Sequence, residues 1–191
     1  MINLFYSSRH WTVLYKNKEY KALNQFYKAL TYVNEMFYKP NQLTINAIQE
    51  EAQNSDYGSG TFQLNSKSVR FRVAKITPNK IGQFVAFWEK DEDNKNQPFS
   101  HEKATDLLVI NTFTSNNNFG QFVFPKEVLV KQNILKTATT KGKMAIRVYP
   151  RWENPSSKQA IETQKWQLAY FVETNNTNSF PAQELLKLYS N

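Results

Sequence analysis

The sequence predicts an α+β fold, in which a mixed β-sheet of about five to six strands is flanked by helices and preceded by an N-terminal helical segment. Three observations support this prediction. Apolar residues recur at helical spacing over residues 18–38, the period changes to strand-like alternation between residues 57 and 88, and strand and helix patterns alternate from residue 106 onward. Such a change of period along one chain is typical of a sheet covered by helices.

The length favours one domain, because 191 residues can bury a single hydrophobic core. We therefore treat residues 1–191 as a single domain with three parts. These are an N-terminal helical extension (1–40), an α/β core (41–173) and a short C-terminal helix (174–191). Five glycines and the lack of a low-complexity stretch argue against a long linker between these parts.

Two helices are expected before the first strand. Residues 18–38 place apolar side chains such as Leu30 and Phe37 on one face, and Pro40 ends this helix. Residues 43–54 (LTINAIQEEAQN) are expected to form the second helix, with their apolar side chains turned inward.

Six strands follow, and helices separate the later ones. The strands are expected at residues 61–64, 67–76, 82–88, 106–112, 120–124 and 143–150. The later helices are expected at residues 125–133, with Pro125 as the first helical residue, 156–173 and 181–189. The nearly unbroken apolar run DLLVINT predicts that the strand at 106–112 lies in the centre of the sheet.

The positive charge of the chain is concentrated in two windows without acidic residues. The first lies between Asp56 and Glu89, and the second runs from Val128 to Trp152. Together they hold 11 of the 24 basic residues and none of the 16 acidic ones, so the net charge of +8 arises there. Because the cations alternate with aromatic residues, the windows predict a surface for a polyanion, with nucleic acid as the favoured partner. The residues expected to contact phosphates are Arg70, Arg72, Lys75, Lys80, Lys141, Lys143, Arg147 and Arg151.

Strand periodicity divides these cations between faces. Arg70 and Arg72 are expected to form an exposed pair, while Lys75 shares the apolar face with Val73. Lys75 therefore either extends past the end of the strand or sits at the rim of the sheet, where it meets a phosphate or activates a water. In the strand segment KMAIRVYPRW, Arg147, Tyr149 and Arg151 share one face, which suits base stacking or phosphate pairing.

A metal-dependent nuclease is the first alternative. Glu51 on the second helix and Asp56 at the following turn are candidate catalytic carboxylates, with Lys75 as the catalytic lysine and Mg²⁺ as the ion they would hold. The PD-(D/E)xK nuclease pattern requires a carboxylate two residues before the lysine, and Val73 occupies that position. Glu51 as a solvent-facing helix residue and Asp56 as a turn residue are the competing interpretations.

Several classes of function have no sequence support. The chain has no cysteine and two histidines, which argues against disulfides, thiolate metal sites and histidine-based triads. We find no phosphate-binding glycine loop and no zinc-protease or serine-hydrolase motif. No cofactor or metal site is expected in a protein without catalysis. The start of the chain does not resemble a signal peptide, and no apolar run is long enough for a membrane, so a cytoplasmic protein is expected.

The stretch from residue 57 to residue 171 resembles the bacterial MepB-like family. The resemblance rests on YGSGTFQLN, RFRVAKITPNKIGQFVAFW, GQFVFPKEVL, KGKMAIRVYPRW and KQAIETQKWQLAYF, in this order. It implies a restriction-endonuclease-like core within residues 41–173 and nucleic-acid binding, and it carries over no catalytic residues.

These observations lead to three hypotheses. The favoured one is a protein without catalysis that binds DNA or RNA along a basic groove. The alternatives are the nuclease described above and a nucleotide pocket in which Lys75 and Arg147 hold one phosphate. The sequence leaves the oligomeric state open.

Overall fold

A six-stranded mixed sheet forms the centre of the molecule. The computed structural model describes residues 25–114, 119–173 and 181–190. In sheet order, the strands are β1 (Ile45–Glu50), β2 (Gly60–Leu64), β3 (Lys67–Val73), β8 (Leu107–Phe113), β9 (Phe119–Pro125) and β11 (Phe171–Glu173). Neighbouring strands are antiparallel, except that β3 and β8 are parallel. The central position predicted for the strand at 106–112 is confirmed, because every residue of β8 is buried.

A three-stranded sheet covers part of one face of the central sheet. Its order is β10 (Ala145–Val148), β5 (Lys80–Ala86) and β4 (Lys75–Thr77), and all pairs are antiparallel. The chain leaves the central sheet at Ala74, whose amide donates to the carbonyl of Asn111. A small hairpin of β6 (Trp88–Lys90) and β7 (Asn96–Pro98) follows β5.

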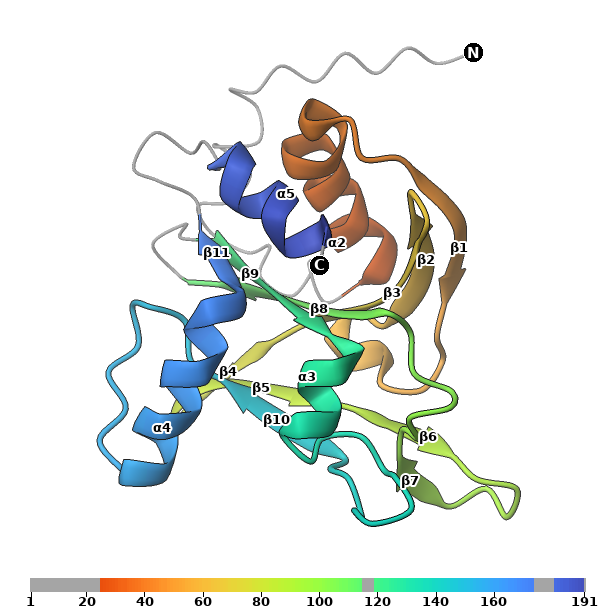
Figure 1. Cartoon of the computed structure of the whole chain (residues 1–191), viewed down its shortest axis with the longest axis vertical. Coiled ribbons are helices and arrows are strands. Elements are labelled where there is room, and N and C mark those ends of the chain that lie inside the picture. Colours follow the sequence, from red (N-terminus) through yellow and green to blue (C-terminus); the bar gives the residue numbers. More distant parts are fainter. Residues whose placement is uncertain (1–24, 115–118, 174–180, 191) are drawn as a thin grey trace.

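Helices lie on both sides of the central sheet (Figure 1). They are α2 (Phe26–Val33), α3 (Lys126–Lys131), α4 (Lys158–Gln167) and α5 (Ala182–Ser190). α2 continues into a π-helical turn (Asn34–Tyr38) and a 3₁₀ turn (Lys39–Asn41). The described part of the helix predicted over 18–38 is thus confirmed, as is the C-terminal helix. Residues 18–24 lie outside the described chain.

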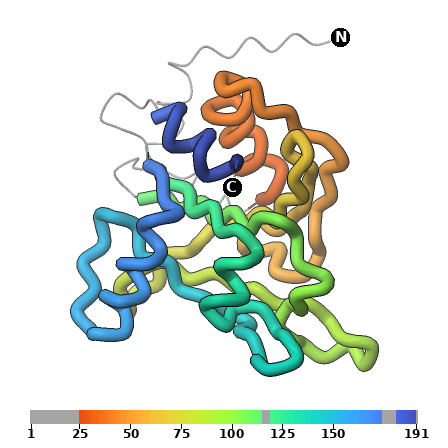
Figure 2. The backbone as a smooth tube through the Cα atoms, in the orientation of Figure 1, coloured from red at the N-terminus to blue at the C-terminus, as the bar shows by residue number. Residues whose placement is uncertain are grey.

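The central sheet therefore has a hydrophobic core on each face. The first core joins the sheet to α2 and α5, which lie side by side in Figures 1 and 2, and it includes Phe71 and Val109. The second core lies between the central sheet, the three-stranded sheet and α3, and it includes Leu108 and Val85. Alternate residues of β8 thus belong to different cores, as expected for a strand covered on both faces.

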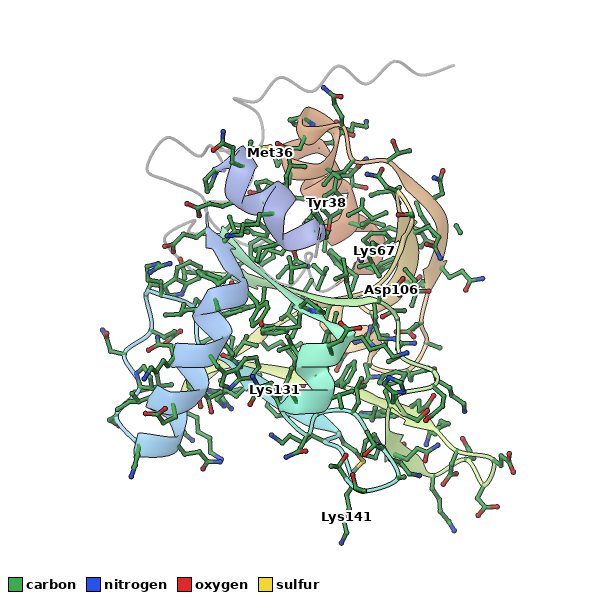
Figure 3. The ribbon with its side chains drawn as sticks, viewed as in Figure 1. Met36, Tyr38, Lys67, Asp106, Lys131 and Lys141 are labelled. Atoms are coloured by element: carbon green, nitrogen blue, oxygen red, sulfur yellow. The ribbon has the colours of Figure 1, made fainter. Side chains whose placement is uncertain are left out.

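The parallel pairing of β3 and β8 is secured at its start. The Asp106 carboxylate accepts from the amide and the hydroxyl of Ser68, both at 2.7 Å. These hydrogen bonds hold the pKa of Asp106 below its usual value. Figure 3 shows Asp106 at this end of the sheet, beside Lys67. Leu107, the next residue, pairs with Val69.

A chain of buried polar groups crosses the first core. The Tyr189 hydroxyl donates to Gln121 Oε1 at 2.6 Å and accepts from the Tyr38 hydroxyl at 2.8 Å. The Gln121 amide donates to Asn111 Oδ1, and the Asn111 amide donates to the Arg72 carbonyl. Burial raises the pKa of both tyrosine hydroxyls. α5 is thereby tied to three strands of the central sheet.

Three predicted elements differ in the structure. The prediction of a second helix at 43–54 is wrong, because residues 45–50 form the edge strand β1. This strand contains a bulge and a positive φ of 50° at Ala47. Residues 171–173 form β11 rather than the end of a helix. Pro125 ends β9 and is the N-cap of α3, so this helix begins at Lys126, one position after the predicted start.

The α+β class with a mixed sheet and flanking helices is confirmed, although the strands at 82–88 and 143–150 belong mainly to the separate three-stranded sheet. The restriction-endonuclease-like core stays a prediction. Among the described residues, no helix is both long and apolar enough to span a membrane.

Candidate functional site

Arg70 and Arg72 are buried, so their predicted exposure is wrong. Arg72 is completely inaccessible and Arg70 is 9% exposed, because a second layer packs over this face of β3. Arg72 Nη1 lies 2.7 Å from Glu51 Oε2, and Arg70 Nε donates to Glu51 Oε1 at 3.1 Å. The Arg70 guanidinium also lies 3.8 Å from the centre of the Phe99 ring. Both arginines therefore pair with a carboxylate in the interior and are not available to contact a phosphate.

Glu51 is committed to this ion pair and lies after β1, not on a helix surface. Burial lowers the pKa of Arg72 to about 10, and the neighbouring Glu51 carboxylate opposes that shift. Arg72 therefore stays protonated at neutral pH, and both oxygens of Glu51 face cations. Across the described residues, no three His, Cys, Asp or Glu side chains are placed to hold a metal ion. The carboxylates of the nuclease hypothesis therefore do not fit a Mg²⁺ site.

Lys75 and Asp56 do come together. Lys75 Nζ lies 3.7 Å from Asp56 Oδ2 and 4.8 Å from the centre of the Tyr57 ring. The predicted shared face of Val73 and Lys75 is wrong, because the chain changes sheets between them. Val73 is in the first core, whereas Lys75 begins β4 of the three-stranded sheet.

A row of three side chains crosses the three-stranded sheet. Phe84 on the middle strand pairs with Lys75 on β4 and with Arg147 on β10. Directly paired side chains lie on the same face of a sheet. The neighbours of Phe84 in sequence, Gln83 and Val85, are completely buried. The row therefore lies on the opposite side of this sheet from the second core.

Two tyrosines extend this row. The Tyr57 ring lies 6.0 Å from the Phe84 ring, and the Tyr149 ring lies over Gly82, where a Cβ atom would be 2.6 Å from it. Gly82 also has a positive φ of 83°, which favours glycine for a second reason. We call the surface formed by Tyr57, Lys75, Phe84, Arg147 and Tyr149 the outer face.

Arg147 is held in place by neutral oxygens. Its Nη1 donates to the Gly82 carbonyl at 2.7 Å, to Thr77 Oγ1 at 3.0 Å and to the Lys80 carbonyl at 3.4 Å. Glu153, at the same end of the sheet, accepts from the Gly82 amide instead. Within the described ranges, no carboxylate forms an ion pair with Arg147. Its guanidinium is thus ordered while its charge is uncompensated.

A pocket of about 720 Å³ lies between β10 and α4. Three cations line it, Lys80, Lys143 and Arg147, and no Asp or Glu does. α4 is attached to β10 by the buried Gln167 side chain, which accepts from the Tyr149 amide and donates to the Arg147 carbonyl, both at 2.9 Å. α4 forms the opposite wall along its length, from its N-cap residue Ser157 to Trp166 and Gln167.

The structure thus gathers four of the eight predicted phosphate contacts, namely Lys75, Lys80, Lys143 and Arg147. Lys141 lies on a loop, and Figure 3 shows its side chain pointing away from the body of the molecule. Arg151 forms an ion pair with Glu173 at 3.0 Å. The sequence reasoning missed Thr77 and Gln167, which position Arg147 and β10. Gln167 is buried in the structure, and no residue pattern in the sequence indicates this.

Comparisons with known proteins agree with the resemblance noted in the sequence. A model of the MepB-like family matches residues 51–173, which include the outer face and all of the pocket lining. The chain is similar to a solved structure described as the crystal structure of MepB, with 46% identity and a TM-score of 0.67. That similarity covers 69% of this chain and 88% of the other. No curated protein matches the chain.

Proposed function

The chain belongs to the MepB-like family, and from this premise we propose that it is a nucleic-acid-binding protein without catalysis. It contacts phosphates through the outer face and the adjoining pocket. The observation that carries the proposal is the uncompensated charge of Arg147, which neutral oxygens hold in a fixed position beside Lys80 and Lys143. An ordered guanidinium without a carboxylate partner is suited to a phosphate.

The arrangement of the cations favours a strand over a single phosphate. Lys143 lies two residues before β10 begins and Arg147 lies within it, so the two cations are spread along one wall of the pocket. Lys75 adds a cation on the far side of Phe84. Its partner Asp56 is 84% exposed, and such surface ion pairs contribute little, so a phosphate can displace it.

A nucleotide-phosphate pocket is the second candidate. It is favoured by the presence of three cations and two aromatic residues, Tyr149 and Trp166, around one pocket. The nuclease alternative has less support, because Glu51 is neutralised by two arginines and Val73 lies in a core.

The proposal is tested by fluorescence anisotropy with labelled single-stranded and duplex DNA and RNA between 50 and 200 mM salt, for the wild type and Arg147→Ala. We expect wild-type affinity to fall steeply with salt. Arg147→Ala should bind roughly tenfold more weakly, and its slope of log affinity against log salt should decrease by about 0.7–0.9, because one phosphate contact is lost.

Arg151→Ala is the matched control, since Arg151 is a surface arginine already paired with Glu173. It should bind like the wild type. The proposal fails if the wild type binds no nucleic acid at the lowest salt, or if Arg147→Ala and Arg151→Ala behave alike. Mononucleotides that raise the melting temperature while oligonucleotides do not bind would instead support the nucleotide pocket.

A further inference from the structure

Phe84 is placed unlike the other phenylalanines in the part of the chain that the structure describes. Every other phenylalanine in the described ranges is at most 6% exposed, whereas Phe84 is half-buried on the outer face. Phe84, Tyr57 and Tyr149 belong to neither hydrophobic core. Aromatic side chains that a fold leaves out of its cores and groups on one face are typical of a binding surface.

The rings of this face are flanked by cations. Arg147 Cζ lies 5.7 Å from the centre of the Phe84 ring, and Lys75 Nζ lies 4.8 Å from that of Tyr57. Because Lys75, Phe84 and Arg147 are paired across three strands, the ring is bracketed by a positive charge on each side. A base stacked on Phe84 would therefore have its adjacent phosphates beside these two cations.

The surface is also fixed before any ligand binds. Phe84 stands on the middle strand of its sheet, so both neighbouring strands restrain its backbone. Tyr57 is carried by the segment between β1 and β2, which Asn54 ties to the Trp88 carbonyl at 2.8 Å. A rigid aromatic surface loses little conformational entropy when a base stacks on it.

We propose that the outer face makes this protein selective for single-stranded nucleic acid, through stacking of unpaired bases on Phe84 and Tyr57. The inference rests on the proposed function and names its substrate class. In a duplex the faces of the bases are covered by their neighbours, so a duplex offers the outer face only its phosphates. A single strand offers phosphates and bases together, and stacking is tolerant of sequence.

The test compares one labelled oligonucleotide as a single strand and as an annealed duplex, with the wild type, Phe84→Leu and Phe84→Ala. We expect the wild type to prefer the single strand. Both variants should bind the single strand roughly tenfold more weakly and the duplex within about twofold of the wild type, because only base stacking is lost. Phe84→Leu keeps an apolar side chain on the middle strand, and circular dichroism verifies its fold.

Tyr27→Ala is the control, because Tyr27 is an aromatic residue that is 54% exposed on α2, away from the outer face. It should bind both probes like the wild type. If the wild type binds single strand and duplex equally and Phe84→Leu binds as tightly, stacking is refuted while the proposed function stands. If Phe84→Leu weakens both probes equally, the ring supports the cations and the single-strand selectivity is refuted. If neither probe binds at 50 mM salt, the proposed function fails as well.

Discussion

β3 and β10 both carry arginine between apolar residues, yet they place their cations in opposite environments. β3 is an interior strand of the central sheet, and its two arginines are buried against Glu51. β10 is an edge strand of the three-stranded sheet, and its Arg147 donates hydrogen bonds to neutral oxygens beside the pocket. The difference lies in the layers around each strand. A cation between two layers requires a carboxylate, whereas a cation on an outer layer is free to meet a ligand.

The largest expected loss of stability comes from removing Glu51, the counter-ion of the two β3 arginines. Glu51→Ala leaves the guanidiniums of Arg70 and Arg72 buried together without a counter-ion. We expect the free energy of unfolding to fall by about 3–5 kcal/mol, measured by urea denaturation. Glu173→Ala removes the carboxylate of an exposed pair instead, so its effect should stay within about 0.5 kcal/mol.

A triple variant separates structure from binding on β3. When Glu51, Arg70 and Arg72 are all replaced by Met, no buried charge is left unpaired, and the stability should stay near that of the wild type or rise. Its nucleic-acid affinity should be unchanged. A loss of affinity in this folded variant would contradict the structural role assigned to the β3 arginines.

The polar interior of the central sheet gives the next largest effect. Tyr189→Phe leaves the Tyr38 hydroxyl and Gln121 Oε1 without their partner, which should cost about 1–3 kcal/mol at neutral pH. Burial raises the pKa of both tyrosines above the unfolded value of 10.0. Their contribution to stability is therefore complete below pH 10 and declines as the pH rises further.

Urea unfolding at pH 8 and pH 11 measures this decline. Tyr189→Phe has one buried hydroxyl fewer, so its stability should fall less between the two pH values than that of the wild type. Tyr27→Phe changes an exposed ring and should follow the wild type at both. An equal alkaline decline in all three proteins would show that the Tyr38–Tyr189 contact is not its cause.

The smallest expected effect comes from loosening the position of the Arg147 guanidinium without changing its charge. Thr77→Val keeps the shape of the side chain but removes one acceptor of Arg147 Nη1. Because the Gly82 carbonyl remains, we expect roughly threefold weaker binding of nucleic acid, about 0.7 kcal/mol. The measurement is the anisotropy titration described above. Unchanged affinity would mean that the charge of Arg147 suffices without its fixed position.

Local patterns predict the parts of the fold that depend on local properties. The apolar run of β8 indicates a central strand, and Pro40 indicates the end of the first helix region. The helix predicted at 43–54 is wrong because the apolar residues of β1 also fit helical spacing. Its pairing with β2 and its bulge at Ala47 depend on a distant partner and an unusual backbone angle.

In the candidate site, too, the sequence predicts local properties but not the contacts between distant segments. Period two correctly separates Arg70 and Arg72 from the apolar face of β3, but it does not reveal that another sheet covers them. Period two also predicts that Arg147 and Tyr149 share one face, and the structure places both on the outer face. The change of sheet at Ala74, which moves Lys75 away from Val73, has no signature in residue type.

The contact between Tyr38 and Tyr189 has a consequence for synthesis on the ribosome. The two hydroxyls are separated by 151 positions in the chain. At a translation rate of about 5–20 residues per second, α5 is synthesised roughly 8–30 seconds after α2, and α5 does not cover the apolar face of α2 during this time. Throughout translation this nascent chain is therefore a candidate client for chaperones that shield uncovered helices, and only the last turns added complete its first core.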